Sequence, residues 1–334
     1  MLTSEIFINK SMSSFDNKIL KIKKFNMDDT IVLVGSPRSG TTWLMELFET
    51  IPGYTHLFEP LNHEWFPELL EVGFKSRSYL TKNSNWPQGE KHMEKILTGD
   101  ISSIFPQYRL ELKEIMHRLL GNKLIIKLVR GNRLLPWLAE KFQLRGIVFI
   151  IRHPCAVIAS QLKTGICGYN STVPPYPDIF PNLERILDEA AKIDGVNYGL
   201  LRKLGGAKTR EEVLAINWCL DNYVPLSSTK PHPWKTLTYE RLVIDGKKEI
   251  IRLFKEIGVK NIPEAAFHHL KIPSTLAPQK EHEIVVNSDQ QLTKWKKILS
   301  KKQIENILNV VSEFGLGFYS EDPEPDYNNI DIRR

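Results

Sequence analysis

The stretch Ile31–Phe48 reads IVLVGSPRSGTTWLMELF, and it is the strongest indication of the fold in this chain. A short β-branched apolar run leads into a tight turn that contains glycine, and an amphipathic helix opens directly from this turn. Strand, turn and helix in this order form a seat for an anion, because the turn's backbone amides and the positive end of the helix dipole converge on one point. The stretch therefore predicts a phosphate-binding loop.

The spacing of this loop is close to that of a nucleotide P-loop, with Gly35 and Gly40 followed by Thr41 and Thr42. The lysine that should follow the second glycine is missing, and Arg38 is the only cation in the loop. In ATPases and kinases that lysine binds the β- and γ-phosphates together with magnesium. The loop argues against an ordinary ATPase or kinase, and a kinase or small NTPase with a degenerate loop is the main alternative.

Apolar runs alternate with helical periodicity along most of the chain. Strands are predicted at 31–35, 123–128, 146–151 and 234–239, and helices around 44–51, 134–142, 154–163, 213–224, 250–257 and 304–311. This alternation predicts a single α/β domain over residues 29–320, with a central parallel sheet flanked by helices on both faces. We expect a polar lead at 1–28, an irregular segment at 72–92 with a helix from there to about Leu120, and an acidic mobile tail at 321–334.

Composition excludes several classes of protein. A net charge of +6 and a pI near 9.0 suit an anionic ligand, but there is no basic stripe with interleaved aromatics and no zinc-finger spacing, so nucleic acid is not expected as a partner. The nine histidines show no paired ligand spacing, which argues against a metal site. No run approaches the roughly 18 apolar residues that span a bilayer, and we expect a cytoplasmic protein.

The three cysteines, Cys155, Cys167 and Cys219, form no CxxC pair and leave an odd count, which indicates reduced thiols rather than a disulfide framework. Cys155 follows Pro154 at a predicted helix start, a position that can lower the pKa of a thiol. Because no base is apparent beside it, we do not expect a catalytic cysteine.

A second candidate anion site lies about 115 residues downstream of the loop. The strand GIVFII runs into Arg152, and Ser160 follows eight residues later on a helix, so the two side chains can converge on one phosphate. Taken alone this pattern is weak, because an arginine paired with a carboxylate beside a helix is the simpler alternative.

Together the two segments resemble the sulfotransferases that use 3′-phosphoadenosine 5′-phosphosulfate (PAPS). SPRSGTTW at 36–43 matches that family's loop for the 5′-phosphosulfate, and the segment from Arg152 to Ser160 matches its 3′-phosphate motif. The resemblance extends from about residue 30 to 320 and includes KLVRGNRLLPWL at 127–138, YERLV at 239–243 and TKWK at 293–296. It implies the P-loop-containing sulfotransferase fold, PAPS as cofactor without a metal, and sulfuryl transfer to a hydroxyl or amine of a small-molecule, natural-product or carbohydrate acceptor.

The resemblance also implies a set of cofactor-binding residues. Ser274 belongs to it because relatives often place a further cofactor contact at that position, although a plain turn serine is the alternative. The full set is Pro37, Arg38, Ser39, Gly40, Thr41, Thr42, Trp43, Arg152, Ser160 and Ser274.

Catalysis by such an enzyme needs positive charge at the leaving oxygen and a base for the acceptor. Arg38 and the helix N-terminus are expected to supply the charge, with Lys127 as a further cation or else a surface lysine. Relatives often place a histidine two residues beyond that lysine, but Val129 stands there.

The segment LFEPLNH at 57–63 offers another base, since it resembles a stretch of carbohydrate sulfotransferases. Glu59 is the expected base, placed after a short strand at the same sheet edge. A structural glutamate paired with a local arginine is the alternative reading, and His63 is the second candidate for the base. Loops 72–92 and 165–181 are expected to wall the acceptor pocket, and loops that serve only packing are the equal alternative. A non-catalytic nucleotide-binding module is the rival from another functional class, and the oligomeric state is left open.

Overall fold

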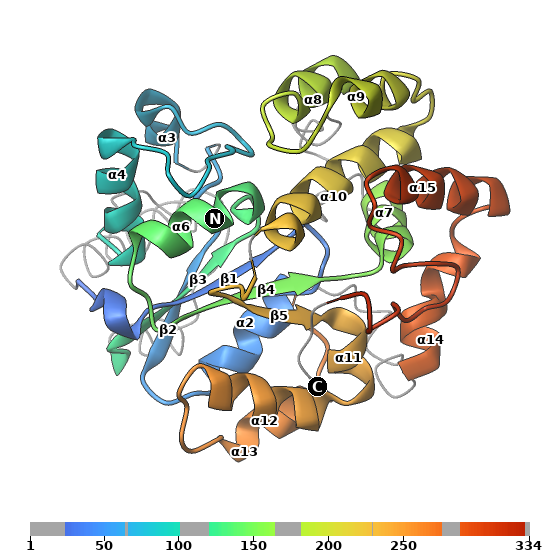
Figure 1. Cartoon of the computed structure of the whole chain (residues 1–334). Helices are drawn as coiled ribbons and strands as arrows, with labels where there is room; N and C mark the ends of the chain where they lie inside the picture. Colours follow the sequence, from blue (N-terminus) through green and yellow to red (C-terminus); the bar gives the residue numbers. More distant parts are fainter. Residues whose placement is uncertain are drawn as a thin grey trace, which may run out of the picture.

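The protein is described by a computed structural model that covers residues 24–63, 66–100, 120–163, 182–228, 230–275 and 288–330. Its centre is a five-stranded sheet in the order β2-β3-β1-β4-β5, and all neighbouring strands are parallel (Figure 1). The strands are β1 (Ile31–Gly35), β2 (Tyr54–Phe58), β3 (Lys123–Leu128), β4 (Gly146–Ile151) and β5 (Lys235–Thr238).

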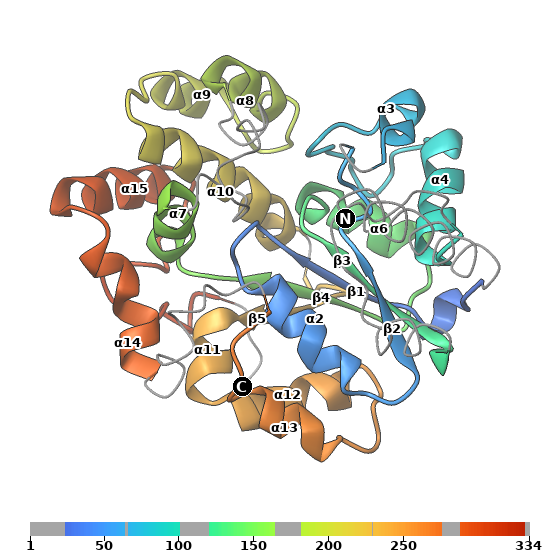
Figure 2. The same ribbon diagram turned by 180° about the vertical axis from the view of Figure 1, so that it is seen from behind.

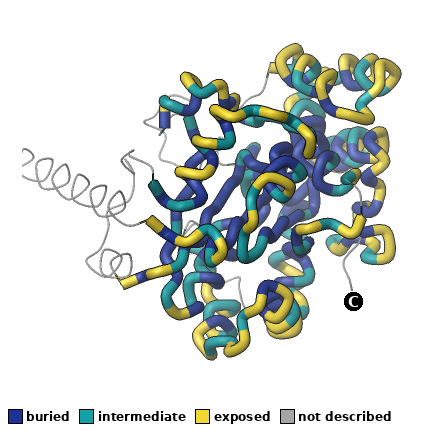
Figure 3. Tube along the Cα trace, turned by 60° about the vertical axis from the view of Figure 1, so that its left-hand side comes forward, coloured by how far each residue is buried: buried dark blue, intermediate teal, exposed yellow. Residues whose placement is uncertain are grey.

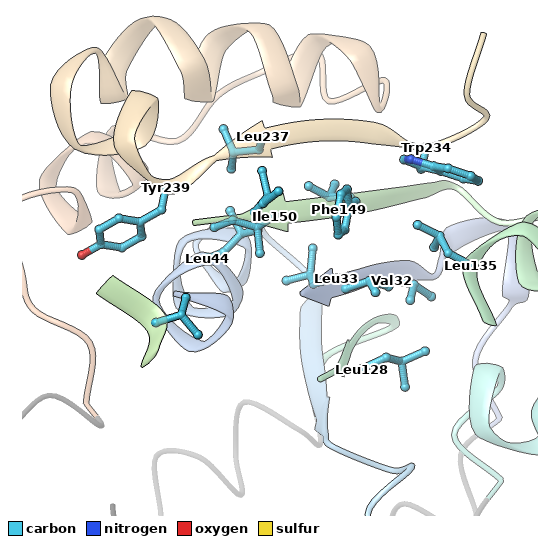
Figure 4. Packing of buried hydrophobic residues seen from close by; sticks show 14 of the residues in the cluster. Val32, Leu33, Leu44, Leu128, Leu135, Phe149, Ile150, Trp234, Leu237 and Tyr239 are labelled. Carbon is cyan, nitrogen blue, oxygen red and sulfur yellow. The ribbon is translucent and has the colours of Figure 1, made fainter. Parts of the chain in front are cut away.

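Strands β1 and β4 are continuous apolar runs, and β3 is apolar apart from Lys123 and Lys127, because both faces of the sheet are covered. Every position of β1 is buried, and β3 and β4 are buried at all positions after their first residue. Figure 4 shows side chains of β1, β4 and β5, such as Leu33, Phe149 and Leu237, packed along the sheet. In Figure 3 the buried positions gather in the sheet, while the exposed positions follow the outer sides of the helices.

One face of the sheet carries the helix that follows the phosphate loop, α2 (Thr41–Glu49), together with three helices from later in the chain (Figures 1 and 2). Helix α2 packs on β1, β2 and β3, and α13 packs on α2. The three later helices are α11 (Tyr239–Ile244), α12 (Gly246–Glu256) and α13 (Glu264–His269).

The opposite face is organised around the long helix α10 (Arg210–Ser227), which packs against α6, α7, α8 and α15. Figures 1 and 2 show α8 and α9 beyond α10, and α3 and α4 on the same side near α6. The helices of this side are α3 (Glu68–Val72), α4 (Pro87–Leu97), α6 (Leu135–Lys141), α7 (Pro154–Lys163), α8 (Leu183–Ala190), α9 (Tyr198–Leu204) and α15 (Lys301–Glu313).

The remaining short elements are the 3₁₀ helices η1 (Met27–Asp29), η2 (Asn132–Leu134) and η5 (Lys294–Lys297), and helix α14 (Ser288–Thr293). The predicted α/β architecture is confirmed, including the strand at 146–151 and the helix at 154–163 with the same bounds. The short strand expected before Glu59 is β2.

The prediction that residues 72–92 are irregular throughout is wrong, because α4 begins at Pro87. Proline at the first helical position starts a helix readily, and the Trp86 ring packs on Phe74, which ties this start to the segment after α3. The continuation of the predicted helix toward Leu120 falls largely on residues 101–119, outside the described ranges, as does the loop expected at 165–181.

A mobile tail was expected after residue 320, but its described part makes specific contacts. The Tyr327 ring lies under the guanidinium of Arg241, 4.1 Å from the ring centroid, and the amide of Asp326 donates to the carbonyl of Phe318 at 2.8 Å. Ile330 is buried. Residues 320–330 therefore pack against α11 rather than extending away from the domain.

Candidate active site

The parallel register brings the residues expected from the sequence to one edge of the sheet. Phe58 pairs with Lys127, Val34 with Leu128, Gly35 with Ile150, and Ile151 with Thr238. The residues that follow these positions therefore emerge side by side at the carboxyl ends of adjacent strands. From β2 to β5, these residues are Glu59, Arg130, the phosphate loop, Arg152 and Tyr239.

Strand β1 lies at the point where the topology changes direction, since β2 and β3 lie on one side of it and β4 and β5 on the other. Ligands of open α/β sheets bind at such points, beyond the carboxyl ends of the strands. The phosphate loop leaves β1 at this position, so the sheet places it at the centre of the edge.

The loop itself has the geometry of an anion seat. Gly40 is the N-cap of α2 with φ 92°, and no side chain caps the helix, so the first amides of α2 are left for a ligand. A Cβ on Gly40 would come within 2.6 Å of the Tyr239 ring, which explains why glycine stands there. Arg38 adopts φ 74°, a left-handed conformation that is costly for a residue with a side chain.

The two predicted anion-binding segments meet. The Nε of Arg38 donates to Ser160 Oγ at 2.9 Å, and Arg152 Nη1 donates to the carbonyl of Arg38 at 3.1 Å. Gln161, which like Ser160 belongs to α7, donates through Nε2 to the carbonyl of Pro37 at 3.2 Å. This third bond holds the loop against α7. In the part of the chain that the structure describes, Arg152 binds the carbonyl of Arg38 and lies on the Tyr239 ring, rather than pairing with a carboxylate as in the alternative.

Tyr239 lies among the candidate site residues, although the sequence did not predict it as one. The guanidinium of Arg152 lies 3.9 Å from the centroid of its ring, and the Trp43 ring packs on it at 5.8 Å. Gln291 Nε2 donates to its hydroxyl at 2.5 Å. Figure 4 shows Tyr239 beyond the end of β5, past the apolar side chains of the core. The YERLV segment at a strand end was the available signal.

A cavity of about 280 Å³ adjoins this aromatic cluster. It is lined by Trp43 and Gln291, by residues of α11 and α12 such as Leu242 and Lys247, and by Leu270 and Lys271, which directly follow α13. The Trp43 ring beside the two lysines suits a flat, negatively charged ligand.

On the other side of the loop, Glu59 forms a cluster with two cations. Its Oε1 accepts from Lys127 Nζ at 2.8 Å, and its Oε2 from Arg130 Nη1 at 3.4 Å. The Glu59 side chain is 18% exposed, whereas that of Lys127 is only 3% exposed. Glu59 also adopts a positive φ of 46°, and among the described non-glycine residues only Arg38 shares this property.

The charges of this cluster shift its pKa values. Burial would raise the pKa of Glu59, but the charges of Lys127 and Arg130 outweigh it and hold that pKa below its usual value. Burial lowers the pKa of Lys127, which Glu59 opposes and the nearby Arg38 reinforces. Glu59 is therefore ionised at neutral pH, as a base must be.

The structure answers two of the alternatives raised by the sequence. Lys127 is buried, with its ammonium 3.7 Å from the Phe58 ring centroid, so the surface-lysine reading is wrong. Glu59 does pair with a local arginine, Arg130, which is the contact that the structural alternative for this carboxylate predicts. His63 lies just beyond the turn closed by the Asn62 amide on the Glu59 carbonyl, and it stays the second candidate.

Two buried polar atoms at the loop are suited to a phosphate or sulfate. Ser39 Oγ and Arg152 Nε are buried and have no hydrogen-bond partner within the described part of the chain. Such atoms are costly unless a ligand satisfies them. Together with the uncapped start of α2, they fit an anionic donor.

The other residues of the predicted cofactor set lie on α2 or beside it. Thr41 is buried, whereas Thr42 is partly exposed in the first turn of α2. The segment carrying Ser274 runs along α2, because Trp43 Nε1 donates to the Ile272 carbonyl at 3.1 Å and the Thr275 amide donates to Glu46 at 3.0 Å.

A buried network supports the segment after β4. His153 accepts from the Cys155 amide through Nδ1, at 3.1 Å, and its own amide donates to Glu240 Oε1 at 2.9 Å. Burial lowers the pKa of His153 to about 4, so the ring is neutral. Tyr319 donates to Glu240 Oε2 at 3.0 Å, so the C-terminal segment closes the network behind Arg152.

The predicted helix start was a reason to expect a lowered pKa for the Cys155 thiol. In the structure, burial raises this pKa to about 12. The start of a helix does not activate this thiol because its side chain is enclosed in the core. Within the described ranges, no group of three or more His, Cys, Asp and Glu is arranged to hold a metal ion. Each helix in these ranges is too short or too polar to span a bilayer.

No protein-family model matches the chain, and no curated protein matches its sequence. Among solved structures, mouse sulfotransferase SULT7A1 complexed with PAP is similar with a TM-score of 0.45 and 15% identity, over 91% of this chain and 90% of that chain. The sulfotransferase domain from the curacin biosynthetic pathway is similar with a TM-score of 0.41 and 15% identity, over 85% of this chain and 96% of that one. Both of these neighbours are sulfotransferases.

Proposed function

We propose that this protein transfers the sulfuryl group of PAPS to a hydroxyl or amine of a small-molecule, natural-product or carbohydrate acceptor. In this reaction the acceptor atom forms a bond to sulfur, and the bond from sulfur to the bridging oxygen breaks. The acceptor's proton passes to Glu59, and adenosine 3′,5′-bisphosphate (PAP) leaves. No metal takes part.

The observation that carries the proposal is the meeting of two separate guanidinium groups at the start of α2. Arg38 reaches Ser160 on α7, and Arg152 reaches back to the backbone of Arg38. A donor with phosphate groups at both its 3′ and 5′ positions has a use for two such cations, whereas a simple phosphate needs one. Arg38 belongs to the 5′ side because it lies within the loop, and Arg152 with Ser160 to the 3′ side.

The charge of the leaving group explains the residues of the loop. When sulfuryl transfer begins, negative charge accumulates on the oxygen between phosphorus and sulfur. By analogy with phosphoryl transfer, donors fixed in advance around that oxygen supply most of the rate enhancement. In this proposal those donors are Arg38 and the first amides of α2, which carry no side-chain cap. PAPS has no γ-phosphate, so the missing lysine is not needed.

Glu59 acts as the base in this proposal, and Lys127 links it to the donor. In the ligand-free protein Lys127 is held by Glu59 at 2.8 Å and lies close enough to Arg38 for their charges to interact. An anionic donor at the loop competes with Glu59 for the ammonium of Lys127. The carboxylate then becomes more basic, because part of the positive charge that lowers its pKa is withdrawn.

Calorimetric titration with PAP tests the proposal most directly. Wild-type protein should bind PAP, and Arg38→Ala and Arg152→Ala should each weaken binding by about tenfold or more, as loss of a charge-assisted contact to phosphate does. Arg202→Ala, which removes an exposed arginine of α9, is the matched control and should bind like wild type. Unchanged affinity in both site variants would remove the two anchors of the proposal.

Two rival functions have their own readouts. Magnesium-dependent turnover of ATP would indicate a kinase or NTPase with a degenerate loop. Thermal stabilisation by PAP without any sulfated product would indicate a non-catalytic nucleotide-binding module. Incubation with labelled PAPS and metabolite extracts separates both from a sulfotransferase, because only an enzyme produces a labelled acceptor.

A cytoplasmic location is part of the proposal. Its support is that the two cysteines of the described ranges, Cys155 and Cys219, are buried free thiols, as is usual in a reducing compartment.

A further inference from the structure

Two consecutive residues of α10, Asp221 and Asn222, are among the most deeply buried polar residues of the described structure, with 2% and 0% of their surface exposed. Neither is a predicted site residue. Their helix crosses the face of the sheet opposite α2 and packs against both α7 and η2 (Figure 1). Buried polar side chains are retained only where they make specific bonds, so the partners of this pair are informative.

Asn222 binds the first residue of the phosphate loop. Its Nδ2 donates to Ser36 Oγ at 3.3 Å and to the Trp218 carbonyl at 2.7 Å. The second contact fixes the orientation of the amide, because the atom facing a carbonyl must be the nitrogen. Oδ1 is consequently left buried without a partner in the described structure. An apolar side chain would avoid this cost, so the stability of the fold alone does not explain the asparagine.

Ser36 controls the turn that follows it. Its carbonyl accepts the amide of Ser39 at 3.1 Å, which closes the turn around Pro37 and Arg38. Arg38 sits in this turn with φ 74°. A residue held in such a conformation needs neighbours that fix it, and Asn222 holds the entrance of the turn while Gln161 and Arg152 hold its other carbonyls.

Asp221 binds the loop of the neighbouring strand. Its Oδ1 accepts from Arg133 Nε at 2.9 Å and its Oδ2 from Arg77 Nε at 3.1 Å. Arg133 belongs to η2, three residues after Arg130 and six after Lys127. Adjacent residues of one helix therefore hold the loops that leave β1 and β3. The first loop carries Arg38, and the second carries Arg130 and follows Lys127 at the end of β3.

We infer that Asn222 is a positioning residue for the phosphate loop, and that Asp221 and Asn222 together set the spacing between this loop and the Glu59–Lys127–Arg130 cluster. This inference rests on the proposed function, because it assigns the loop an anionic donor. Asn222 acts through Ser36 and touches no ligand. The geometry it maintains is the distance between the donor's leaving oxygen and the base, to which transfer reactions are sensitive at the 1 Å scale.

The test is a double-mutant cycle on PAP affinity, measured by calorimetry with Asn222→Leu, Ser36→Ala and the double variant. Each single variant should weaken PAP binding by about tenfold, and the double variant should be no weaker than the worse single one, because both remove the same bond. The thermal midpoint without ligand should change little in Asn222→Leu, because leucine also removes the unpartnered Oδ1. Asn306→Ala, which breaks the α10–α15 bond from Asn306 to Glu211, is the control for general disturbance of α10 and should bind PAP like wild type.

Three results would overturn the inference while leaving the proposed function intact. These are wild-type affinity in Asn222→Leu, additive losses in the cycle, or an equal loss in Asn306→Ala. If Asn222→Leu does not fold, Ser36→Ala decides alone, since it removes only a hydroxyl. If the wild-type protein itself does not bind PAP, the proposed function fails and this inference fails with it, so the two failures are distinguished by the wild-type titration.

Discussion

Glu59 and Glu240 are two carboxylates at the same edge of one sheet, each near an arginine, and they differ in ionisation. Glu59 contacts the charged groups of Lys127 and Arg130 and has a lowered pKa. Glu240 is 1% exposed and accepts from two neutral donors, the His153 amide and the Tyr319 hydroxyl. Burial raises its pKa to about 7, although those hydrogen bonds and the charge of Arg152 oppose the rise.

The difference shows what sets the ionisation of a buried carboxylate. Neutral hydrogen bonds did not offset the burial of Glu240, whereas two cations in direct contact did so for Glu59. Environments that push two pKa values apart are how one fold separates a charged, reactive group from a structural one. In this protein the ionised carboxylate lies on the β2–β3 side of the phosphate loop, and the carboxylate with the raised pKa lies behind Arg152 on the β4–β5 side.

The largest expected effect is on Glu59 as the base. Glu59→Gln should reduce transfer from labelled PAPS by about 10²-fold or more, the usual scale for loss of acid–base help, while PAP affinity by calorimetry stays nearly intact. Glu49→Gln is the matched control, since Glu49 pairs with His56, at the end of the helix remote from the loop. Wild-type turnover in Glu59→Gln would return this residue to a structural role and favour His63.

A smaller effect is expected when one of the two cations is removed from Glu59. Lys127→Met should lower the turnover number by about tenfold, within the range for loss of a single electrostatic contact in an active site. The pKa of Glu59 should rise, because Lys127 contributes to lowering it. The acid limb of the pH–rate profile should therefore move to higher pH. A profile that does not move would mean that Glu59 is not the titrating base.

The third prediction concerns stability on the Glu240 side. Because the pKa of Glu240 is raised from 4.5 to about 7, its protonated form stabilises the folded state fully below pH 4.5, and this contribution is lost as the pH rises through 7. Glu240→Gln lacks this loss. The thermal midpoint of the variant minus that of wild type should therefore increase as the pH is raised from 4.5 to 8. The effect of His153 has the opposite sign and cancels in the comparison. A difference that stays constant over this range would contradict the raised pKa.

The smallest effect is expected from Tyr319→Phe, which removes one neutral hydrogen bond to Glu240. The free energy of unfolding should fall by about 1 kcal/mol, as for a single buried bond, measured by urea denaturation. The pKa of Glu240 should rise further, because the Tyr319 hydroxyl lowers it. Phe318→Leu is a suitable control for packing in the same segment, and it should leave the pH dependence of stability unchanged.

The parts that the sequence predicted well are contiguous. The loop from Gly35 to Trp43 and the segment from Arg152 to Ser160 each combine a strand end with a helix start, so local periodicity and turn residues are enough to place them. The parts it missed depend on distant segments. Tyr239 reaches Arg152 only because β5 lies beside β4. The contacts of residues 320–330 were unexpected because an acidic, proline-containing composition indicates a mobile end.

The sequence by itself determined the α/β class, the strand, turn and helix of the loop, and the places of Arg38 and Arg152 after two strand ends, because these follow from short-range patterns of apolar, glycine and basic residues. Only the tertiary structure decided the state of the groups around the loop. The register of β2 with β3 buries Lys127 against Glu59, and enclosure in the core keeps Cys155 protonated. Asn222, on a helix far away in the chain, donates a hydrogen bond to Ser36. Burial and partner distance set ionisation, and neither can be read from residues that are far apart in the chain.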